Sequence, residues 1–276
     1  MDAYELGNAE QGRTYLTKAI ELNPDNAEAY QQNAIVIARE KDLDEAERLL
    51  EKAIHAGLSD DGIAYTRAEI AFAKEDYDEA KTYFLEAKDT TDDPYTKMRA
   101  YLKLVEIGKL TEASFDERLG ILSEAEANVE AQYRPLMDEQ MAQLYIDRFG
   151  ESGDEEDANA AIAILQKLAD DGFATFQTYE NMVLVLQSEH KIDEECEVLD
   201  EMLDMYGDDY RIYMYYAYAE VLRQETLVNE KRSYKAFLKY YEKASALYEE
   251  QAKDDSNPLM QRLEENYQQA KSGNWL

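Results

Sequence analysis

The residue types that most often carry out catalysis or hold metals are sparse in this sequence. His55 and His190 lie far apart, and neither has a cysteine or a second histidine at the spacing of a zinc site. The single cysteine, Cys196, lies in the acidic stretch 194–197, and neighbouring carboxylates disfavour the thiolate form that a nucleophile needs. The sequence therefore predicts no metal site, and a helix-face cysteine rather than a nucleophile.

Acidic pairs are the next candidates, because carboxylates bind calcium. The pairs are Asp60-Asp61, Asp170-Asp171 and Asp208-Asp209. None begins the D-x-D-x-D-G loop with a distal glutamate that a calcium site of the EF-hand type uses, so turns between helices are the better interpretation. The sequence also has no glycine-rich phosphate loop and no G-x-S-x-G motif. We therefore expect no enzymatic activity and no cofactor.

A stripe of lysines is the clearest basic feature. Lys231, Lys235, Lys239 and Lys243 recur every four residues, which predicts one face of a helix. Such a face could receive an acidic or phosphorylated segment. The alternative is a solvated flank whose lysines balance nearby glutamates.

The overall charge limits the kinds of partner. The 276 residues include 61 acidic and 29 basic side chains, a formal net charge of −32. This charge disfavours nucleic acids and anionic membranes and favours partners with basic segments, although acidic residues that only solvate helix surfaces would also produce it. The sequence has no run of 18 apolar residues and no signal pattern at its start, which predicts no membrane insertion and a cytoplasmic location.

A repeat explains how the chain is organised. Residues of similar type recur 34 residues apart in three tracks, which are Ala19, Ala53 and Ala87, then Leu16, Leu50 and Phe84, then Gly12, Ala46 and Ala80. Within 27–57, one apolar stripe of helical spacing ends before Lys41 and a second begins at Leu43, and 61–89 repeats this pattern. Few glycines (11) and prolines (4) occur, which also favours helices. A fixed period of this length indicates stacked helical hairpins.

These residues resemble the tetratricopeptide repeat family. Tyr30, Ala34 and Ile37 match the first helix of its hairpin, Ala46, Leu50 and Ala53 match the second, and Pro24 matches the proline that follows the second helix. The match is specific over residues 10–89 and looser beyond them. The resemblance implies an all-α fold, a right-handed α-solenoid of about seven stacked hairpins with a C-terminal capping helix.

We expect one solenoid over residues 1–276. Its units are expected at 1–24 (incomplete), 27–57, 61–89, 93–128, 130–171, 175–206 and 209–250, with the capping helix at 257–271. Either residues 5–12 are a fused remnant of a first helix, or Met1 falls within a repeat of a longer parent protein. A long acidic turn is expected at 150–159, and Glu195 stands where the family has alanine, which puts the packing of that helix in doubt.

The resemblance also implies a binding groove lined by the first helix of each hairpin. Matching positions give the expected inner residues as Gln31, Ile35, Arg39, Tyr65, Glu69, Phe72, Asn181, Leu184, Tyr215 and Tyr218. The two tyrosines belong to the tyrosine-rich stretch 206–222, whose rings could grip an extended peptide or, alternatively, pack against the neighbouring repeat. Family members that clamp the carboxylate tail of chaperones use lysine, asparagine and arginine on successive helices. Asn33 and Arg39 are only fragments of that set, so we do not expect such a clamp.

The sequence therefore predicts a scaffold that binds a peptide or protein segment in its groove. The alternative is a regulatory or partner-recruiting module of a larger bacterial signalling protein, such as a kinase or transcription regulator. A catalytic domain preceding Met1 in the parent gene would favour the alternative.

Overall fold

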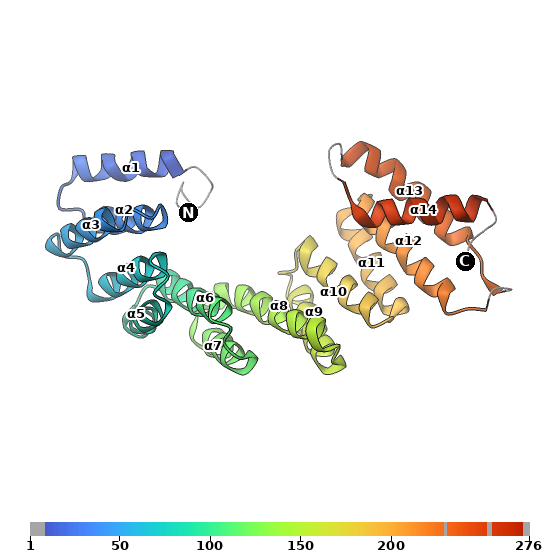
Figure 1. The fold of residues 1–276 in the computed structure, drawn as a ribbon, viewed down its shortest axis with the longest axis horizontal. Helices are drawn as coiled ribbons and strands as arrows, with labels where there is room; N and C mark the ends of the chain where they lie inside the picture. The colour runs from blue at the N-terminus through green and yellow to red at the C-terminus, as the bar shows by residue number, and fades with distance from the viewer. Residues whose placement is uncertain (1–8, 229–230, 253–255, 273–276) are drawn as a thin grey trace. The chain divides into compact units, whose positions relative to one another are not determined.

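The computed structural model describes residues 9–228, 231–252 and 256–272, and this part of the chain is built from α-helices (Figure 1). The helices are α1 (Ala9–Leu22), α2 (Ala27–Arg39), α3 (Leu43–His55), α4 (Asp60–Ala73), α5 (Tyr77–Thr90), α6 (Pro94–Leu110), α7 (Phe115–Asn128), α8 (Arg134–Ser152), α9 (Glu155–Asp170), α10 (Phe176–Ser188), α11 (Ile192–Tyr206), α12 (Tyr210–Glu225), α13 (Lys235–Gln251) and α14 (Pro258–Lys271). A short 3₁₀ turn, η1 (Ala131–Tyr133), precedes α8. The expected all-α solenoid is confirmed.

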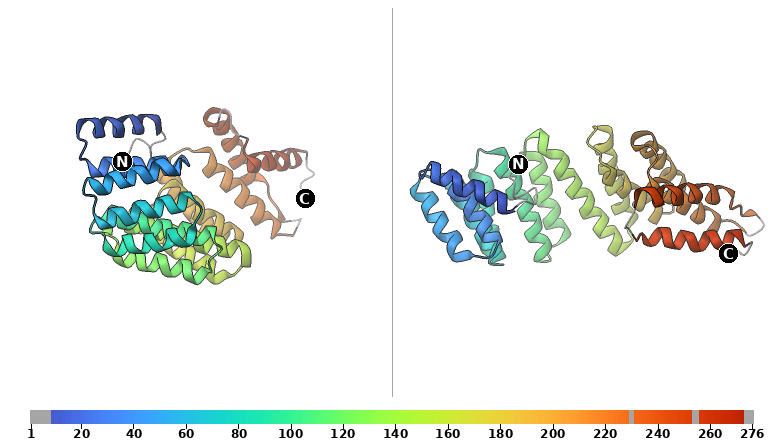
Figure 2. Two further views of the ribbon diagram at one scale, coloured as in Figure 1. Left: turned by 60° about the vertical axis from the view of Figure 1, so that its left-hand side comes forward. Right: turned by 90° about the horizontal axis from the view of Figure 1, so that it is seen from above.

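The chain divides into two compact units, residues 1–137 (unit 1) and 138–276 (unit 2), and the boundary falls within α8. In unit 1 the hairpins α2/α3, α4/α5 and α6/α7 follow one another, each contacting the next, and α1 packs on α2 (Figures 1 and 2). In unit 2, α9 to α13 contact one another in chain order and α14 packs on α12 and α13. Residues 1–8 of the expected first unit lie outside the described residues. A single solenoid over the whole length stays a prediction.

Alanines bring the two helices of a hairpin close together. Ala34 and Ala46 belong to one buried cluster, Ala68 and Ala80 to the next, and all four side chains are completely buried. Phe84 fills the space beside the second pair and is also fully buried. Small side chains at these positions allow helix axes to approach to about 8–10 Å.

The nearly identical turn segments 41–46 and 75–80 repeat because each has the same structural task. Asp42 and Asp76 cap the second helix of their hairpins, their side chains accepting from the backbone N–H groups of Glu45 and Glu79. An aspartate cap satisfies one of the free N–H groups of a first helical turn, and its charge is favourable at that end. The following alanine then enters the helix–helix contact.

Lys41 and Glu75, the residues before these two aspartates, adopt the left-handed conformation, with φ of 68° and 65°. Glu112 and His190 adopt it in the corresponding turns of two further hairpins, with φ of 54° and 56°. Residues other than glycine pay a steric cost there, which is of order 1 kcal/mol. We expect Glu112→Gly to stabilise unit 1 by about 0.5 kcal/mol, because relief of that cost outweighs glycine's extra entropy in the unfolded chain. Urea unfolding followed by circular dichroism tests this, and a loss of stability would contradict it.

The expected long acidic turn at 150–159 is wrong. Helix α8 continues to Ser152 and α9 begins at Glu155, so the connection is two residues long. Asp154 caps α9, and the Asp157 carboxylate, almost fully buried, forms an ion pair with Arg148 of α8. Acidic residues in a first helical turn are stabilising, so acidity here marks a helix start rather than a loop.

Glu195 does take the buried place that the family gives to alanine. The residue is fully buried in α11, and α10, α11 and α12 still pack through one continuous core. Its Oε1 accepts a hydrogen bond of 2.8 Å from Gln187 Nε2 of α10, whereas its Oε2 is buried without a partner. Burial raises the pKa of Glu195 to about 7, against the smaller opposing effects of the Gln187 bond and the Arg223 charge.

Candidate functional site

The expected groove residues of unit 1 lie on the face formed by α2, α4 and α6, but several are not available to a ligand. Ile35 and Tyr65 are 4% and 5% exposed, and Glu69 is 1% exposed. Gln31 is half-buried and donates to the backbone oxygen of Gly62 at the start of α4. The expectation that Ile35, Tyr65 and Glu69 form an exposed groove wall is therefore corrected, because each of these side chains is covered by the neighbouring helices.

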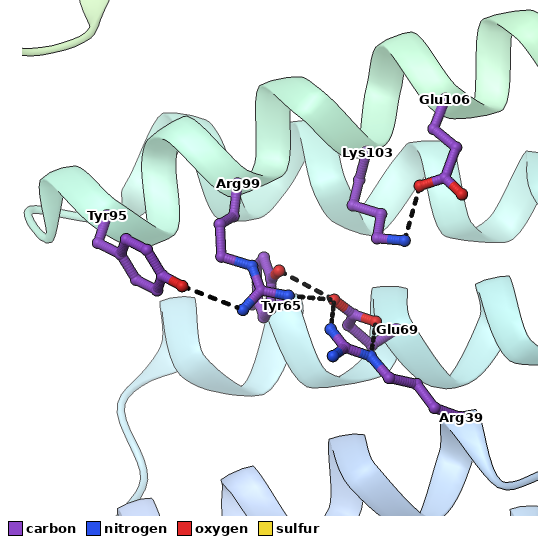
Figure 3. A network of polar contacts seen from close by, with 7 residues as sticks. All are labelled: Arg39, Tyr65, Glu69, Tyr95, Arg99, Lys103 and Glu106. Carbon is purple, nitrogen blue, oxygen red and sulfur yellow. Dashed lines mark hydrogen bonds and ion pairs between the residues drawn. The ribbon is translucent and has the colours of Figure 1, made fainter. Parts of the chain in front are cut away.

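Glu69 is the centre of a polar network that joins three helices (Figure 3). Arg39 of α2 donates to both carboxylate oxygens, with Nε–Oε2 3.3 Å and Nη2–Oε1 3.0 Å. Tyr65 donates to Oε1 at 2.9 Å from the preceding turn of α4, and Arg99 Nη2 of α6 lies 3.6 Å from the same oxygen. One buried carboxylate thus connects the first helices of three successive hairpins.

The electrostatics of the network keep this carboxylate ionised. Burial raises the pKa of Glu69, but attraction to Arg39, its hydrogen bonds, and the charges of Lys103 and Arg99 outweigh burial, so the pKa is lowered overall. For Tyr65, burial and the nearby Glu69 charge raise the pKa well above its ordinary value. A charge-assisted network of this kind rigidifies the wall.

A pocket of about 290 Å³ opens beside the network, at the C-terminal ends of α2, α4 and α6. Its lining residues are Arg39, Lys41, Glu69, Phe72, Ala73, Glu75, Tyr77, Lys103, Glu106 and Leu110. Three of the residues predicted from sequence, Arg39, Glu69 and Phe72, therefore meet at one cavity. Leu110 is half exposed there, at 50%.

The aromatic floor of the pocket is held by neighbours on both sides. Phe72 packs edge-to-face against Tyr77, with ring centroids 5.6 Å apart. Lys103 Nζ lies 4.1 Å from the centroid of Phe72 and forms a 2.7 Å ion pair with Glu106. A cation over an aromatic face is attracted by the ring's quadrupole. The pocket therefore presents an aromatic and aliphatic floor inside a ring of paired charges.

The sequence predictions missed the contribution of α6. Arg99, Lys103 and Glu106 follow one another at spacings of four and three residues, which places them on one helix face. That spacing was a usable signal, but the resemblance was only loose beyond residue 90, so no inner positions were transferred to this helix.

In unit 2, three of the four expected residues, Asn181, Leu184 and Tyr218, keep exposed surface, and one is buried. Leu184 is 43% exposed and Tyr218 is half-buried, whereas Tyr215 is 6% exposed and donates a 2.8 Å hydrogen bond to Glu180 of α10. Asn181 accepts from Gln177, one turn earlier. Burial and the Glu180 charge raise the pKa of Tyr215. The exposed position expected for Tyr215 is thus corrected, and packing against the neighbouring repeat is what the structure shows for this ring.

Only part of the predicted lysine stripe lies on a helix. Helix α13 begins at Lys235, so Lys231 precedes it and does not share its face. Lys239 lies over the ring of Tyr240 on its own helix, and Lys243 contacts α12 and the turn before it, pairing with Asp208 at 2.5 Å and lying 5.4 Å from the Tyr213 ring. The stripe as a binding surface stays a prediction.

Other sites of chemistry are not found among the described residues. In that part of the chain, no group of three histidine, cysteine, aspartate or glutamate side chains is placed to hold a metal ion. Burial raises the pKa of Cys196, and the Arg223 contact at 3.7 Å from its sulfur only partly offsets this. Across the same ranges, no helix has both the length and the apolar character to cross a bilayer.

Comparison with solved structures identifies the fold. The C-terminal part of a tetratricopeptide repeat-containing protein from Cytophaga hutchinsonii superposes with a TM-score of 0.63 at 12% identity, over 94% of this chain and 96% of that one. This is the tetratricopeptide repeat fold. PilF of Pseudomonas aeruginosa gives a TM-score of 0.51 at 18% identity, over 75% of this chain and 88% of that one. Human IFIT1, solved with m7Gppp-AAAA, gives 0.51 at 14% identity, over 95% of this chain and 58% of that one.

No protein-family profile and no curated protein sequence matches the chain. The tetratricopeptide repeat resemblance seen in residues 10–89 is thus confirmed at the level of fold.

Proposed function

We propose that this tetratricopeptide repeat chain is a non-enzymatic scaffold that binds a segment of a partner protein on the α2/α4/α6 face of unit 1. The observation that supports it is the pocket beside Glu69, where a half-exposed Leu110 and the Phe72 ring lie within a rim of charges. A site with an apolar floor and a few fixed polar groups is typical of side-chain recognition.

The partner that this surface fits is a protein rather than a nucleic acid. The IFIT1 structure contains RNA, but it shares only the fold with this chain. A net charge of −32 opposes the phosphate backbone, whose binding depends on neutralisation by basic side chains.

The proposal is tested with peptides selected from a random-sequence phage library on the immobilised full chain. Affinities of the enriched peptides are then measured by fluorescence anisotropy. We expect Leu110→Ser to weaken binding about tenfold, because it removes much of an apolar contact worth roughly 1–2 kcal/mol. Leu110 is already exposed, so the fold is expected to tolerate the change.

Leu85→Ser is the matched control, because Leu85 is 38% exposed on α5 and does not line the pocket. We expect this variant to bind like the wild type. Failure to enrich any peptide, or peptides indifferent to Leu110→Ser, would count against the proposed site.

A further inference from the structure

We infer that the pocket selects a partner segment carrying an apolar side chain next to a lysine or arginine, and that Glu69 makes it reject acidic segments. This inference rests on the proposed function, because it names the chemistry of the partner at the same site. Three features carry it: the carboxylate of Glu69, the helix ends around the pocket, and the exposed acids at its mouth.

Glu69 fills the place that a partner's carboxylate would need. Arg39, Arg99 and Lys103 are the basic side chains nearest this carboxylate, and their charges act on it. Arg39 already contacts both of its oxygens, and Arg99 and Tyr65 face Oε1. A second carboxylate would therefore meet Glu69 across a short distance, and like charges at such range repel strongly.

The position of the pocket favours a cation. The last residues of α2, α4 and α6 are Arg39, Ala73 and Leu110, and all three line it. Helix C-termini carry partial negative charge on their free carbonyl groups. One ammonium of this chain already uses such a carbonyl, since Lys41 Nζ donates to Ala73 O at 2.6 Å.

The acids at the mouth keep capacity for a further cation. Glu75 is 70% exposed and pairs with Lys41 at 3.3 Å through Oε1, and Glu106 is 49% exposed and pairs with Lys103 through Oε2. An ionised carboxylate offers about four acceptor positions, so one lysine does not saturate it. The lysines of the rim, in contrast, are each neutralised by one of these carboxylates.

The apolar part of the occupant follows from the floor. Phe72, Tyr77 and Leu110 line the pocket together, and the volume of about 290 Å³ accommodates one large aliphatic or aromatic side chain. An adjacent lysine or arginine of the same segment would then reach Glu75 or Glu106. The chain's charge of −32 would speed the approach of such a segment.

The test uses one enriched peptide with a lysine beside its apolar anchor, and its Lys→Met version. We expect the double variant Glu75→Gln/Glu106→Gln to bind the lysine peptide about fivefold more weakly, and to bind the methionine peptide like the wild type. The control is Glu47→Gln/Glu51→Gln, which removes the same charge from exposed positions on α3. We expect this variant to change the affinity less than twofold, because a charge effect at long range is screened by salt.

A second arm tests the role of Glu69 with a labelled tetraglutamate peptide. We expect no binding to the wild type, and measurable binding to Glu69→Ala, in which the arginines lose their carboxylate. If circular dichroism shows that Glu69→Ala is unfolded, the Glu69→Gln variant is used in its place. Tetraglutamate captured by the wild type, or by neither variant, would overturn the assignment of Glu69.

The proposed site and the chemistry inferred for its partner can be overturned separately. Acidic enriched peptides, or a lysine peptide whose affinity does not change in Glu75→Gln/Glu106→Gln, would overturn the inferred chemistry. If the same peptides still bound more weakly to Leu110→Ser, the proposed site would stand. Peptides indifferent to Leu110→Ser would remove the site itself.

Discussion

Replacing Glu195 with glutamine is expected to stabilise the protein by about 3 kcal/mol at pH 8, with almost no gain at pH 4.5. Glu195 is fully buried, and burial raises its pKa from 4.5 to about 7. A carboxyl whose pKa is raised on folding stabilises the folded state fully below pH 4.5, and this contribution is lost as the pH rises through 7. At pH 8 the folded protein therefore holds a buried charge that glutamine lacks.

The surroundings explain why the charge is poorly compensated. Gln187 supplies the one hydrogen bond, and Oε2 has none. Arg223 of α12 is the nearest opposing charge that acts on Glu195, but it is already engaged by Asp193 at 2.7 Å and Glu220 at 3.3 Å. A buried carboxylate without a full set of partners is costly.

Urea unfolding followed by circular dichroism at the two pH values measures this effect. Glu197→Gln is the matched control, because it removes the same charge from an exposed position two residues later in α11. The quantity of interest is the difference in gain between pH 8 and pH 4.5, which cancels any fixed cost of the new amide. A gain for Glu195→Gln that is no larger at pH 8 than at pH 4.5 would show that ionisation of Glu195 carries no penalty in the folded protein.

Glu195 also marks where sequence reasoning reached its limit. The 34-residue tracks predicted the small buried residues of α3 and α5, because packing of the first hairpins depends on side-chain size at fixed spacing. At Glu195 the same rule expects alanine, and the sequence alone does not tell that a neighbouring Gln187 and the surrounding core hold a carboxyl there. Tertiary context decides such positions.

The candidate site shows a similar division. Arg39, Glu69 and Phe72 were assigned to one face through the resemblance to the tetratricopeptide repeat family, and they do line one pocket. Whether each is exposed depends on residues about 30 positions away, since Arg39 and Arg99 cover Glu69 from other helices. The third helix of the site was missed although a step of 34 residues from Tyr65, Glu69 and Phe72 leads to Arg99, Lys103 and Glu106, because the resemblance was loose beyond residue 90 and no inner positions were transferred to α6.

Replacing Arg39 with leucine is expected to destabilise unit 1 by about 3 kcal/mol, since it leaves the buried carboxylate of Glu69 short of its main partner. Arg39 is the largest opposing charge on Glu69, whose side chain is 1% exposed. Arg99, 3.6 Å away, and Tyr65 retain part of the compensation, which keeps the loss at the lower end of the range for broken buried pairs.

Arg13→Leu provides the comparison, because Arg13 forms a 2.8 Å ion pair with Glu40 whose side chains are 49% and 31% exposed. An exposed pair contributes about 0.2–1 kcal/mol, so this variant is expected to stay close to the wild type. The pH dependence adds a second readout: the pKa of Glu69 is lowered on folding, so the network stabilises above pH 4.5 and its contribution fades as the pH falls through the folded value. Urea unfolding at pH 7 and pH 4 should therefore show the gap between Arg39→Leu and the wild type narrowing with acid. An Arg39→Leu variant no less stable than Arg13→Leu at pH 7 would mean that the Glu69 network does not stabilise the wall on which the proposed site depends.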